Sequence, residues 1–270
     1  MNCYEGFASM YDALMTDAPY DTWAAYINDL LATAAQPPFA DNLHSGQHAR
    51  LEASCSFQSK KLLVLDLACG TGNITLRLAK MGYDLIGVDA SEDMLAEANR
   101  KAYEQGEKIL FLAQDMRELD LYGTVDAVVC VCDGMNYILT DEDLLTVFKR
   151  VRLFLNAGGV FMFDMNTEYK FKEFENLIFE DKGEGGEAYE WQNHYNPETK
   201  INEYHMTFYY ENDNDNTESF SELHRQRAYP LVDVCNMLIE AGFVSVAMRD
   251  DYTSQPPKAE STRVVFIAAG

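Results

Sequence analysis

The residues best placed to do chemistry are an acid and two glycines in the segment Leu62–Gly72, LLVLDLACGTG. Its apolar run predicts a buried strand with Asp66 near its end, and Gly70 and Gly72 predict a turn that opens a helix. Glycines let the backbone approach a ligand, and the free N–H groups of a helix start attract an anion such as a carboxylate. A close-fitting ligand explains this pattern, and so would a tight turn alone.

Two further carboxylates follow the next two predicted strands. Asp89 comes after the strand over 83–88, where it could bind ribose hydroxyls at the carboxyl edge of a parallel sheet. Asp115 follows the strand over 109–113 and would lie near an adenine edge. Three acids after three successive strands suit a cationic nucleoside better than a pyrophosphate. A dinucleotide site would instead begin its turn with glycine and add a third glycine near Thr75, which disfavours a nicotinamide-dependent oxidoreductase.

The surrounding elements alternate between helix and strand. Strands are expected over 62–67, 83–88, 109–113, 125–131, 159–165, 243–248 and 262–268, and helices over 7–17, 21–35, 72–81, 92–103, from 140 onward and over 231–241. This order predicts a doubly wound α/β fold with a mostly parallel seven-stranded sheet. The period-two pattern of 188–228 predicts an antiparallel β insertion instead. We therefore divide the chain into 1–60 (helices and a polar loop), an α/β domain of 61–165 and 229–270, and an insertion of 166–228.

The composition restricts the class of protein. A formal net charge of −23 over 270 residues repels phosphate backbones and anionic lipid surfaces, so small neutral or cationic partners are favoured over nucleic acid or membrane. No apolar run reaches the roughly 20 residues that span a bilayer, and the N-terminus lacks the pattern of a signal peptide. We therefore expect a cytoplasmic protein. The six cysteines have no paired spacing, so we expect no metal site.

The block from Lys61 to Phe163 resembles the cofactor half of class I S-adenosylmethionine methyltransferases, and VLDLACGTG is a specific form of their first motif. The resemblance implies that Asp66, Gly70 and Gly72 hold the methionine end of the cofactor. The same turn contributes Ala68 and Cys69, and Cys69 occupies a place where many members have glycine. A residue there would be strained only if its φ were positive.

The other roles are also implied by the resemblance. Asp89 would bind the ribose and Asp115 with Met116 the adenine, while Ala90 and Met94 would pack on the adenine ring. Cys132 and Asp133, after the fourth strand, would lie beside the methionine part and the methyl group.

Other segments resemble a narrower group of small-molecule methyltransferases, which includes sugar-amine N-methyltransferases. They are YEGFASMYDALM near the N-terminus, YDTW at 20–23, DGMNYI at 133–138 and SELHRQRAYPL at 221–231. In such proteins the first helices form a lid and the insertion covers the acceptor pocket. Tyr4, Tyr11 and Trp23 are therefore candidates for cofactor or pocket residues, and core packing is the alternative for Trp23.

Methyl transfer from a sulfonium is an in-line displacement that needs alignment, exclusion of water and, for some acceptors, a proton acceptor. Asp133, Tyr11, His205 and His224 are the candidates for such a catalytic role. In the insertion, Glu203, His205 and Thr207 would share one face with Glu222, His224 and Gln226 of a neighbouring strand. That face would either roof the pocket or face solvent, with Tyr204, Met206 and Phe208 packed inward.

The sequence therefore predicts an S-adenosylmethionine-dependent methyltransferase that acts on nitrogen or oxygen of a small-molecule acceptor. The alternatives are a non-catalytic protein that binds S-adenosylmethionine and a tRNA or RNA methyltransferase, which the net charge disfavours. The sequence predicts neither the acceptor nor the oligomeric state.

Overall fold

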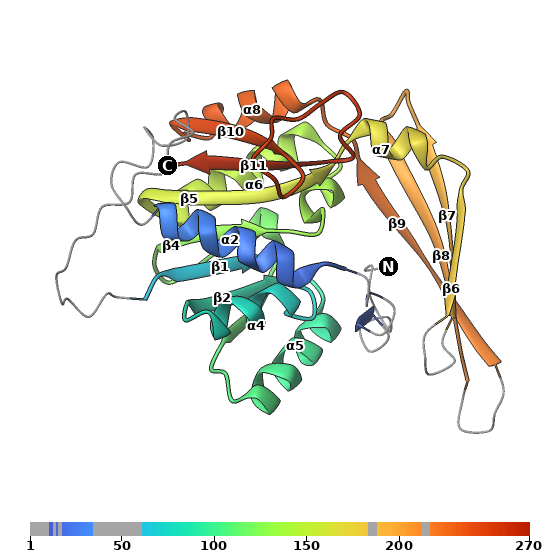
Figure 1. Cartoon of the computed structure of the whole chain (residues 1–270), viewed down its shortest axis with the longest axis horizontal. Helices are drawn as coiled ribbons and strands as arrows, with labels where there is room; N and C mark the ends of the chain where they lie inside the picture. Colours follow the sequence, from blue (N-terminus) through green and yellow to red (C-terminus); the bar gives the residue numbers. More distant parts are fainter. Residues whose placement is uncertain (1–10, 13–14, 16–17, 35–60, 183–187, 212–216) are drawn as a thin grey trace.

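The computed structural model describes residues 11–12, 15, 18–34, 61–182, 188–211 and 217–270, and the following account is confined to them. They form a seven-stranded sheet with helices on both sides and a separate four-stranded sheet beyond one end of it (Figure 1). The expected fold class is confirmed. The expected helix over 7–17, the loop over 36–60 and Tyr4 lie wholly or mostly outside the described residues.

The large sheet has the strand order β10-β11-β5-β4-β1-β2-β3. Its neighbours from β5 to β3 run parallel, whereas β11 is antiparallel to both β5 and β10. The strand order reverses between β1 and β4, because β2 and β3 follow on one side of β1 and β4 and β5 on the other. Open α/β sheets bind ligands at such a reversal. The strands are β1 (Leu63–Leu67), β2 (Asp84–Asp89), β3 (Leu110–Ala113), β4 (Val125–Cys130), β5 (Leu155–Asn166), β10 (Ser245–Asp250) and β11 (Arg263–Ala269).

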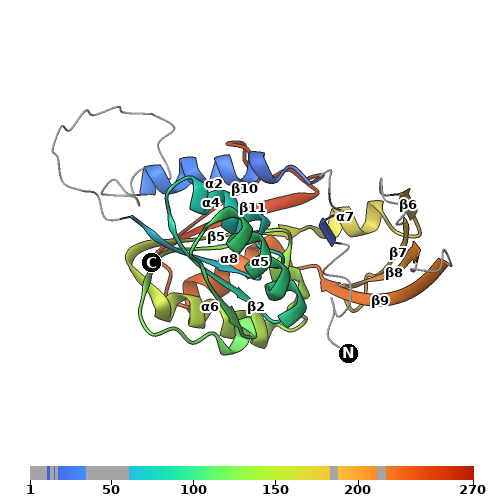
Figure 2. The ribbon, with the colours of Figure 1, turned by 90° about the horizontal axis from the view of Figure 1, so that it is seen from below.

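Helices cover both faces of this sheet because its central strands are apolar on both sides. One face packs on α2 (Tyr20–Ala34) and α4 (Asn73–Lys80), and the other on α6 (Asp141–Phe154) and α8 (Leu231–Glu240). Figure 2 shows α2 and α6 on opposite sides of the sheet. The helix α5 (Glu92–Gln105) lies against β2 and β3. In the described part of the chain, no helix is long and apolar enough to cross a membrane.

The helix starts follow from local chemistry. The Ser91 hydroxyl accepts the N–H of Met94 at the start of α5, and the Thr140 hydroxyl accepts the N–H of Asp143 at the start of α6. Serine and threonine are preferred residues at this position, and each satisfies a backbone donor that the helix leaves without a partner. Gly106 ends α5 in the left-handed conformation, with φ 72°.

The small sheet has the order β6-β7-β8-β9, and all of its neighbouring strands are antiparallel. Its strands are β6 (Ile178–Lys182), β7 (Ala188–Asn196), β8 (Ile201–Glu211) and β9 (Thr217–Arg227), and it is joined to β5 through α7 (Glu168–Glu173). The sequence predicted an antiparallel insertion but neither β6 nor α7.

One face of the small sheet is turned toward the α/β domain. This inner face carries Phe208, which is completely buried and packs with Met94 of α5 and with Tyr11. The same face carries buried polar groups near the base of the sheet, including Asn193, Asn202, His224 and Gln226. The aromatic Tyr204–Met206–Phe208 face therefore points inward, as one of the two sequence-based alternatives expected.

Candidate functional site

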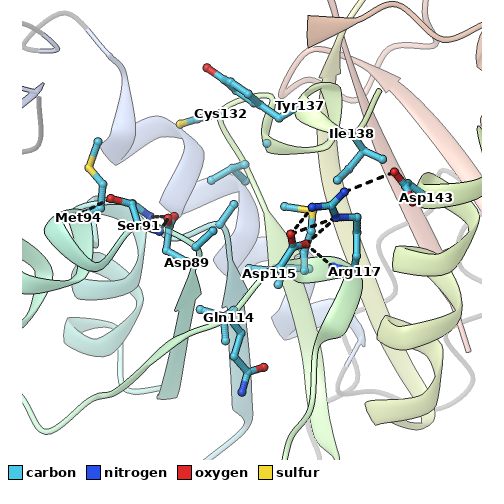
Figure 3. A pocket seen from close by; sticks show the side chains of 18 of the residues that line it. Asp89, Ser91, Met94, Gln114, Asp115, Arg117, Cys132, Tyr137, Ile138 and Asp143 are labelled. Carbon is cyan, nitrogen blue, oxygen red and sulfur yellow. Dashed lines mark hydrogen bonds and ion pairs between the residues drawn. The ribbon is translucent and has the colours of Figure 1, made fainter. Parts of the chain in front are cut away.

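A cavity of about 560 Å³ lies at the carboxyl ends of β1, β2 and β4. Its size falls within the range of roughly 300–1,000 Å³ that is usual for small-molecule sites. Figure 3 shows Asp89, Ser91 and Met94 on one wall, and Asp115, Arg117 and Asp143 on the opposite wall. Cys132 and Tyr137 lie at one end of the space between these walls. The residues that line the cavity include nine of the predicted positions: Tyr11, Ala68, Gly70, Asp89, Ala90, Met94, Asp115, Met116 and Cys132.

The glycine-rich turn joins β1 to α4 beneath this cavity. Gly70 has φ +53°, and no atom lies within 4 Å of the position that a Cβ would occupy there, so its backbone faces open space. Gly72 has φ +77° and would bring a Cβ to 3.1 Å from the Cβ of Ala98. Among the non-glycine residues of the turn it is Ala68 that has a positive φ, 59°, and not Cys69. Cys69 therefore occupies its place without backbone strain.

Asp89 holds this turn in place from the end of β2. Its Oδ2 accepts the backbone N–H of Gly70 at 2.8 Å, and its Oδ1 accepts the N–H of Ser91 at 2.9 Å. Each carboxylate oxygen has a second lone pair, so the group can also accept hydrogen bonds from a ligand in the cavity. Burial raises the pKa of Asp89, and these backbone hydrogen bonds lower it in part.

Asp66 lies below the turn and is almost completely buried. It accepts a hydrogen bond of 2.5 Å from the Thr75 hydroxyl, and it lines a smaller cavity next to the main one together with Tyr11, Cys69 and Gly70. Burial, and to a smaller extent the charge of Asp89, raises the pKa of Asp66 to about 7. Asp66 is therefore close to half-protonated at neutral pH.

This raised pKa predicts a pH dependence of stability. The folded protein retains a proton on Asp66 between the ordinary pKa of 3.8 and about 7, whereas the unfolded chain has lost it. The contribution of Asp66 to the free energy of unfolding therefore decreases as pH rises through this window, by at most about 1.4 kcal/mol per pH unit. We expect Asp66→Asn to remove this decrease, which urea unfolding of both proteins at pH 5, 6 and 7 measures. If the free energy of unfolding depends on pH in the same way in both proteins, the raised pKa of Asp66 is contradicted.

The opposite wall carries a charge cluster that the sequence did not reveal. Asp115 caps the short helix η1 (Met116–Glu118) by accepting the N–H of Arg117, and the Arg117 guanidinium binds the same carboxylate at 2.5 Å. Arg117 also lies 3.5 Å from Asp143 at the start of α6. The neighbouring guanidinium lowers the pKa of Asp115, which keeps the carboxylate ionised. Asp115 is thus at the predicted place but is already held by a cation.

After β4 the backbone takes a strained turn. Cys132 and Asp133 both have positive φ, 61° and 53°, which costs a non-glycine residue of the order of 1–3 kcal/mol. The turn is fixed because the N–H of Asp133 donates to the buried carboxylate of Asp164 at 2.9 Å. Arg263 of β11 then binds both Asp164 and, at 3.4 Å, Asp133. Gln226 of β9 donates to Asp133 at 2.5 Å, which links the insertion to the turn.

Three side chains at this end of the cavity form a hydrogen-bonded chain. The short helix η2 (Gly134–Tyr137) brings the Tyr137 hydroxyl to 3.1 Å from Nδ1 of His224, and Nε2 of His224 is 2.8 Å from a carboxylate oxygen of Glu222. Tyr137 lines the cavity, whereas His224 is buried behind it. Sequence reasoning had identified His224 but not Tyr137, although Tyr137 lies in the quoted DGMNYI segment.

The expectation that His205 and His224 share a face of the insertion is wrong. In the β8–β9 register Tyr204 pairs with His224 and His205 pairs with Leu223, so the two histidines lie on opposite faces. His205 is half-exposed on the outer face, close to Glu203. An error of one residue in the expected register moves a side chain to the other face.

Tyr11 and Asp12, the first residues that the structure describes, lie next to the glycine-rich turn. Tyr11 lines the cavity. Asp12 accepts hydrogen bonds of 2.7 Å from Thr71 and from Asn73, and its other oxygen binds Lys101 of α5 at 2.5 Å. We refer to Asp12, Thr71, Asn73 and Lys101 as the N-terminal clasp. The clasp was not predicted.

Trp23 does not line the cavity. It stacks on Tyr252 with a ring separation of 5.3 Å, and the Arg263 guanidinium lies 5.2 Å from its ring. The structure therefore favours the core-packing alternative for Trp23. Tyr4 lies outside the described residues. Among the residues that the structure describes, no three histidine, cysteine or acidic side chains are grouped so as to hold a metal ion.

Comparison with known proteins agrees with this geometry. Residues 64–159 match the family model described as "Methyltransferase domain". A Bacillus subtilis (strain 168) protein named "Putative methyltransferase YqeM" is 36% identical over 98% of this chain and 96% of its own. A crystal structure of a S-adenosylmethionine-dependent methyltransferase from Clostridium acetobutylicum ATCC 824 covers 99% of both chains, with 28% identity and a TM-score of 0.79.

A more distant structure shares the fold. CalS10 of Micromonospora echinaspora, an amino pentose methyltransferase, covers this chain completely with a TM-score of 0.70 at 18% identity, and its structure has S-adenosylmethionine bound. The glycine-rich turn, the cavity at the reversal of strand order and these relatives lead to one conclusion. The chain belongs to the class I methyltransferases and is an enzyme that uses S-adenosylmethionine.

Proposed function

We propose that this enzyme transfers the methyl group of S-adenosylmethionine to a nitrogen or oxygen of a small-molecule acceptor by in-line displacement. The observation that carries the proposal is the junction at the end of β4. There Asp133, fixed by Arg263 and Gln226, and the cavity-lining Tyr137 lie between the cofactor cavity and the inner face of the insertion. Packing of Phe208 on Met94 brings that face against the cavity wall, which favours a small acceptor over a large polymer.

The cofactor assignments fit the residues at hand. The cavity volume and the open space above Gly70 suit a nucleoside held close to the backbone. In this arrangement Asp89 binds the ribose hydroxyls, and Asp115 with Met116 contacts the adenine. Asp66, Gly70 and Gly72 surround the methionine end, whose ammonium group suits the nearby acids. The bound cofactor supplies an electrophilic methyl group, so the protein has to align the acceptor and exclude water.

In this proposal the insertion and the N-terminal residues enclose the site. Residues 166–228 cover the acceptor, Tyr11 forms part of the cavity wall, and the N-terminal clasp ties Asp12 to the glycine-rich turn and to α5. The net charge of −23 supports a small neutral or cationic acceptor over RNA.

An acceptor panel tests the proposal. We would incubate the enzyme with S-adenosylmethionine and a set of amines, amino sugars, phenols and small carboxylic acids, and separately with unmodified tRNA, and detect S-adenosylhomocysteine and the methylated product by mass spectrometry. The expected result is stoichiometric formation of both from at least one acceptor. Tight S-adenosylhomocysteine binding without product from any acceptor would instead support the non-catalytic alternative. Methylation of RNA alone would move the assignment to the tRNA and RNA methyltransferases.

A further inference from the structure

Lys170 is a cation beside the site that forms no ion pair with any carboxylate of the residues that the structure describes. It lies on α7, which joins the two sheets (Figure 1), and its side chain is half-buried. Nζ donates to Oδ1 of Asn166 at 2.9 Å and lies 5.9 Å from the centre of the Phe174 ring. An ammonium group has three donors, so two of them remain for a ligand or water.

This ammonium group belongs to the same polar network as the turn after β4. Asn166 donates to Gln226 at 3.2 Å, and Gln226 in turn donates to Asp133 at 2.5 Å. Asn166 is also the partner of Arg263 in the pairing of β5 with β11, so these two side chains lie on one face of the sheet. Lys170 therefore lies at the edge of the junction where the acceptor is proposed to bind.

The acids of this junction are bound by Arg263 and not by Lys170. The Arg263 guanidinium binds Asp164 and lies 3.4 Å from Asp133 and 3.9 Å from Asp251. Burial lowers the pKa of Lys170, and the charge of Asp133 raises it in part. Charged groups that are removed from water are normally paired. The position of Lys170 therefore favours an anionic group on the ligand.

We propose that the methyl acceptor carries a carboxylate group and that Lys170 is the specificity-determining residue that binds it. This inference rests on the proposed function and names the class of its acceptor, a small amine that also bears a carboxylate. The nitrogen lies toward Asp133, beside the methyl group, and the carboxylate pairs with Lys170. Such an acceptor is a zwitterion without net charge, so the net charge of −23 does not repel it.

A carboxylate suits this position better than a phosphate. A carboxylate carries one negative charge, which the one ammonium group of Lys170 balances. A phosphate monoester carries about −1.5 to −2 at neutral pH, and its excess charge would face the carboxylate of Asp133. The charges of the described residues therefore favour the smaller anion.

The surroundings of Lys170 strengthen such an ion pair. Phe174 contacts the ring of Phe179 at 5.7 Å, and Phe179 contacts that of Trp191 at 5.1 Å, so a row of aromatic rings begins at the lysine. Water screens a charge less in such apolar surroundings, which makes the attraction larger. The indole nitrogen of Trp191 is buried and has no acceptor among the described residues, so it is a second donor on this face of the insertion.

Matched acceptors test the inference with the wild type alone. Each acceptor that yields product in the panel is compared with its counterpart that lacks or gains a carboxylate, such as ethylamine with β-alanine, tyramine with tyrosine and histamine with histidine. O-Phosphoethanolamine is the phosphate-bearing counterpart of ethylamine. We expect kcat/KM for the carboxylate-bearing member to be higher by about 10–100-fold, the effect typical of one hydrogen bond to a charged group.

A variant of the lysine completes the comparison. Lys170→Met should raise the KM of the carboxylate-bearing acceptor by about 10–100-fold. The KM of its counterpart without a carboxylate and the dissociation constant of S-adenosylhomocysteine should stay within about two-fold of the wild type. Lys170→Arg keeps the charge and should regain part of the loss. Lys172→Met is the matched control, because Lys172 lies on the same helix but pairs with Glu168 at the surface, at 2.9 Å.

The outcomes separate recognition from structure. A merely structural role of Lys170 raises the KM of both members of a pair equally in Lys170→Met, which overturns the inference. A wild type that prefers acceptors without a carboxylate also overturns it, and so does a preference for the phosphate-bearing amine. Circular dichroism verifies that each variant is folded. If the wild type methylates no small acceptor, the proposed function itself fails and this inference fails with it.

Discussion

Replacement of Asp89 by alanine is expected to weaken binding of S-adenosylhomocysteine by about 10²–10⁴-fold. In the proposed cofactor site Asp89 accepts two hydrogen bonds from ribose hydroxyls, and a hydrogen bond to a charged group is worth about 1.5–3 kcal/mol. Loss of both weakens binding by about 3–6 kcal/mol, and about 1.4 kcal/mol corresponds to a factor of ten in affinity. The variant also loses the acceptor for the N–H groups of Gly70 and Ser91. The turn that forms the floor of the cavity is therefore less well fixed.

Isothermal titration calorimetry measures this loss, and circular dichroism verifies that the variant is folded. Asp84→Ala is the matched control, because Asp84 begins the same strand β2 but is exposed at its far end. We expect the control to bind as the wild type does. Asp89→Asn should lie between the two, since an amide oxygen still accepts one hydrogen bond but carries no charge. Equal affinities of the wild type and Asp89→Ala would remove Asp89 from the ribose site.

The second large effect is expected on stability, when Arg263 is replaced. Replacement of Arg263 by methionine leaves Asp164, which is completely buried, without its cation. Removal of one partner from a buried ion pair typically costs about 3–5 kcal/mol. Burial already raises the pKa of Asp164, and the Arg263 charge lowers it in part, so this pKa rises further in the variant. We expect the free energy of unfolding from urea titration to fall by about 3–5 kcal/mol.

The double variant Arg263→Met with Asp164→Asn tests the reason for this loss. It no longer contains an unpaired charge at the completely buried position 164, and we expect it to regain more than half of the lost free energy. Arg225→Met is the control, since Arg225 pairs with Glu203 on the exposed face of the insertion, where an ion pair contributes about 0–1 kcal/mol. A double variant as unstable as Arg263→Met alone would show that the arginine stabilises the fold in another way, such as through its contact with Trp23.

Most of the large sheet could be predicted from the sequence because its signals are local. The apolar runs and the order of helices and strands gave element boundaries within a few residues of those in the structure. The glycine-rich turn and Asp89 were also predictable, because each follows directly after a strand. Parallel strands place their carboxyl ends at one edge, so such residues are brought together by the topology itself.

The features that the sequence did not predict depend on contacts between distant segments of the chain. The pairing of β8 with β9 decides which face His224 occupies, and period-two alternation does not specify the register of two strands. Tyr137 was missed because its partner is 87 residues away along the chain. Arg117 and Arg263 were missed because nothing in the local pattern distinguishes a cation that binds buried acids from one that faces solvent.

The position of Arg263 along the chain has a consequence for biosynthesis. Arg263 follows Asp164 by 99 residues and Asp133 by 130. At a synthesis rate of about 5–20 residues per second, Asp164 leaves the peptidyl-transferase centre about 5–20 seconds before Arg263 is added. During that interval β5 lacks its neighbour β11, and the acids that fix the turn after β4 lack their cation. The nascent chain is therefore expected to acquire cofactor affinity only after β11 has emerged from the ribosome.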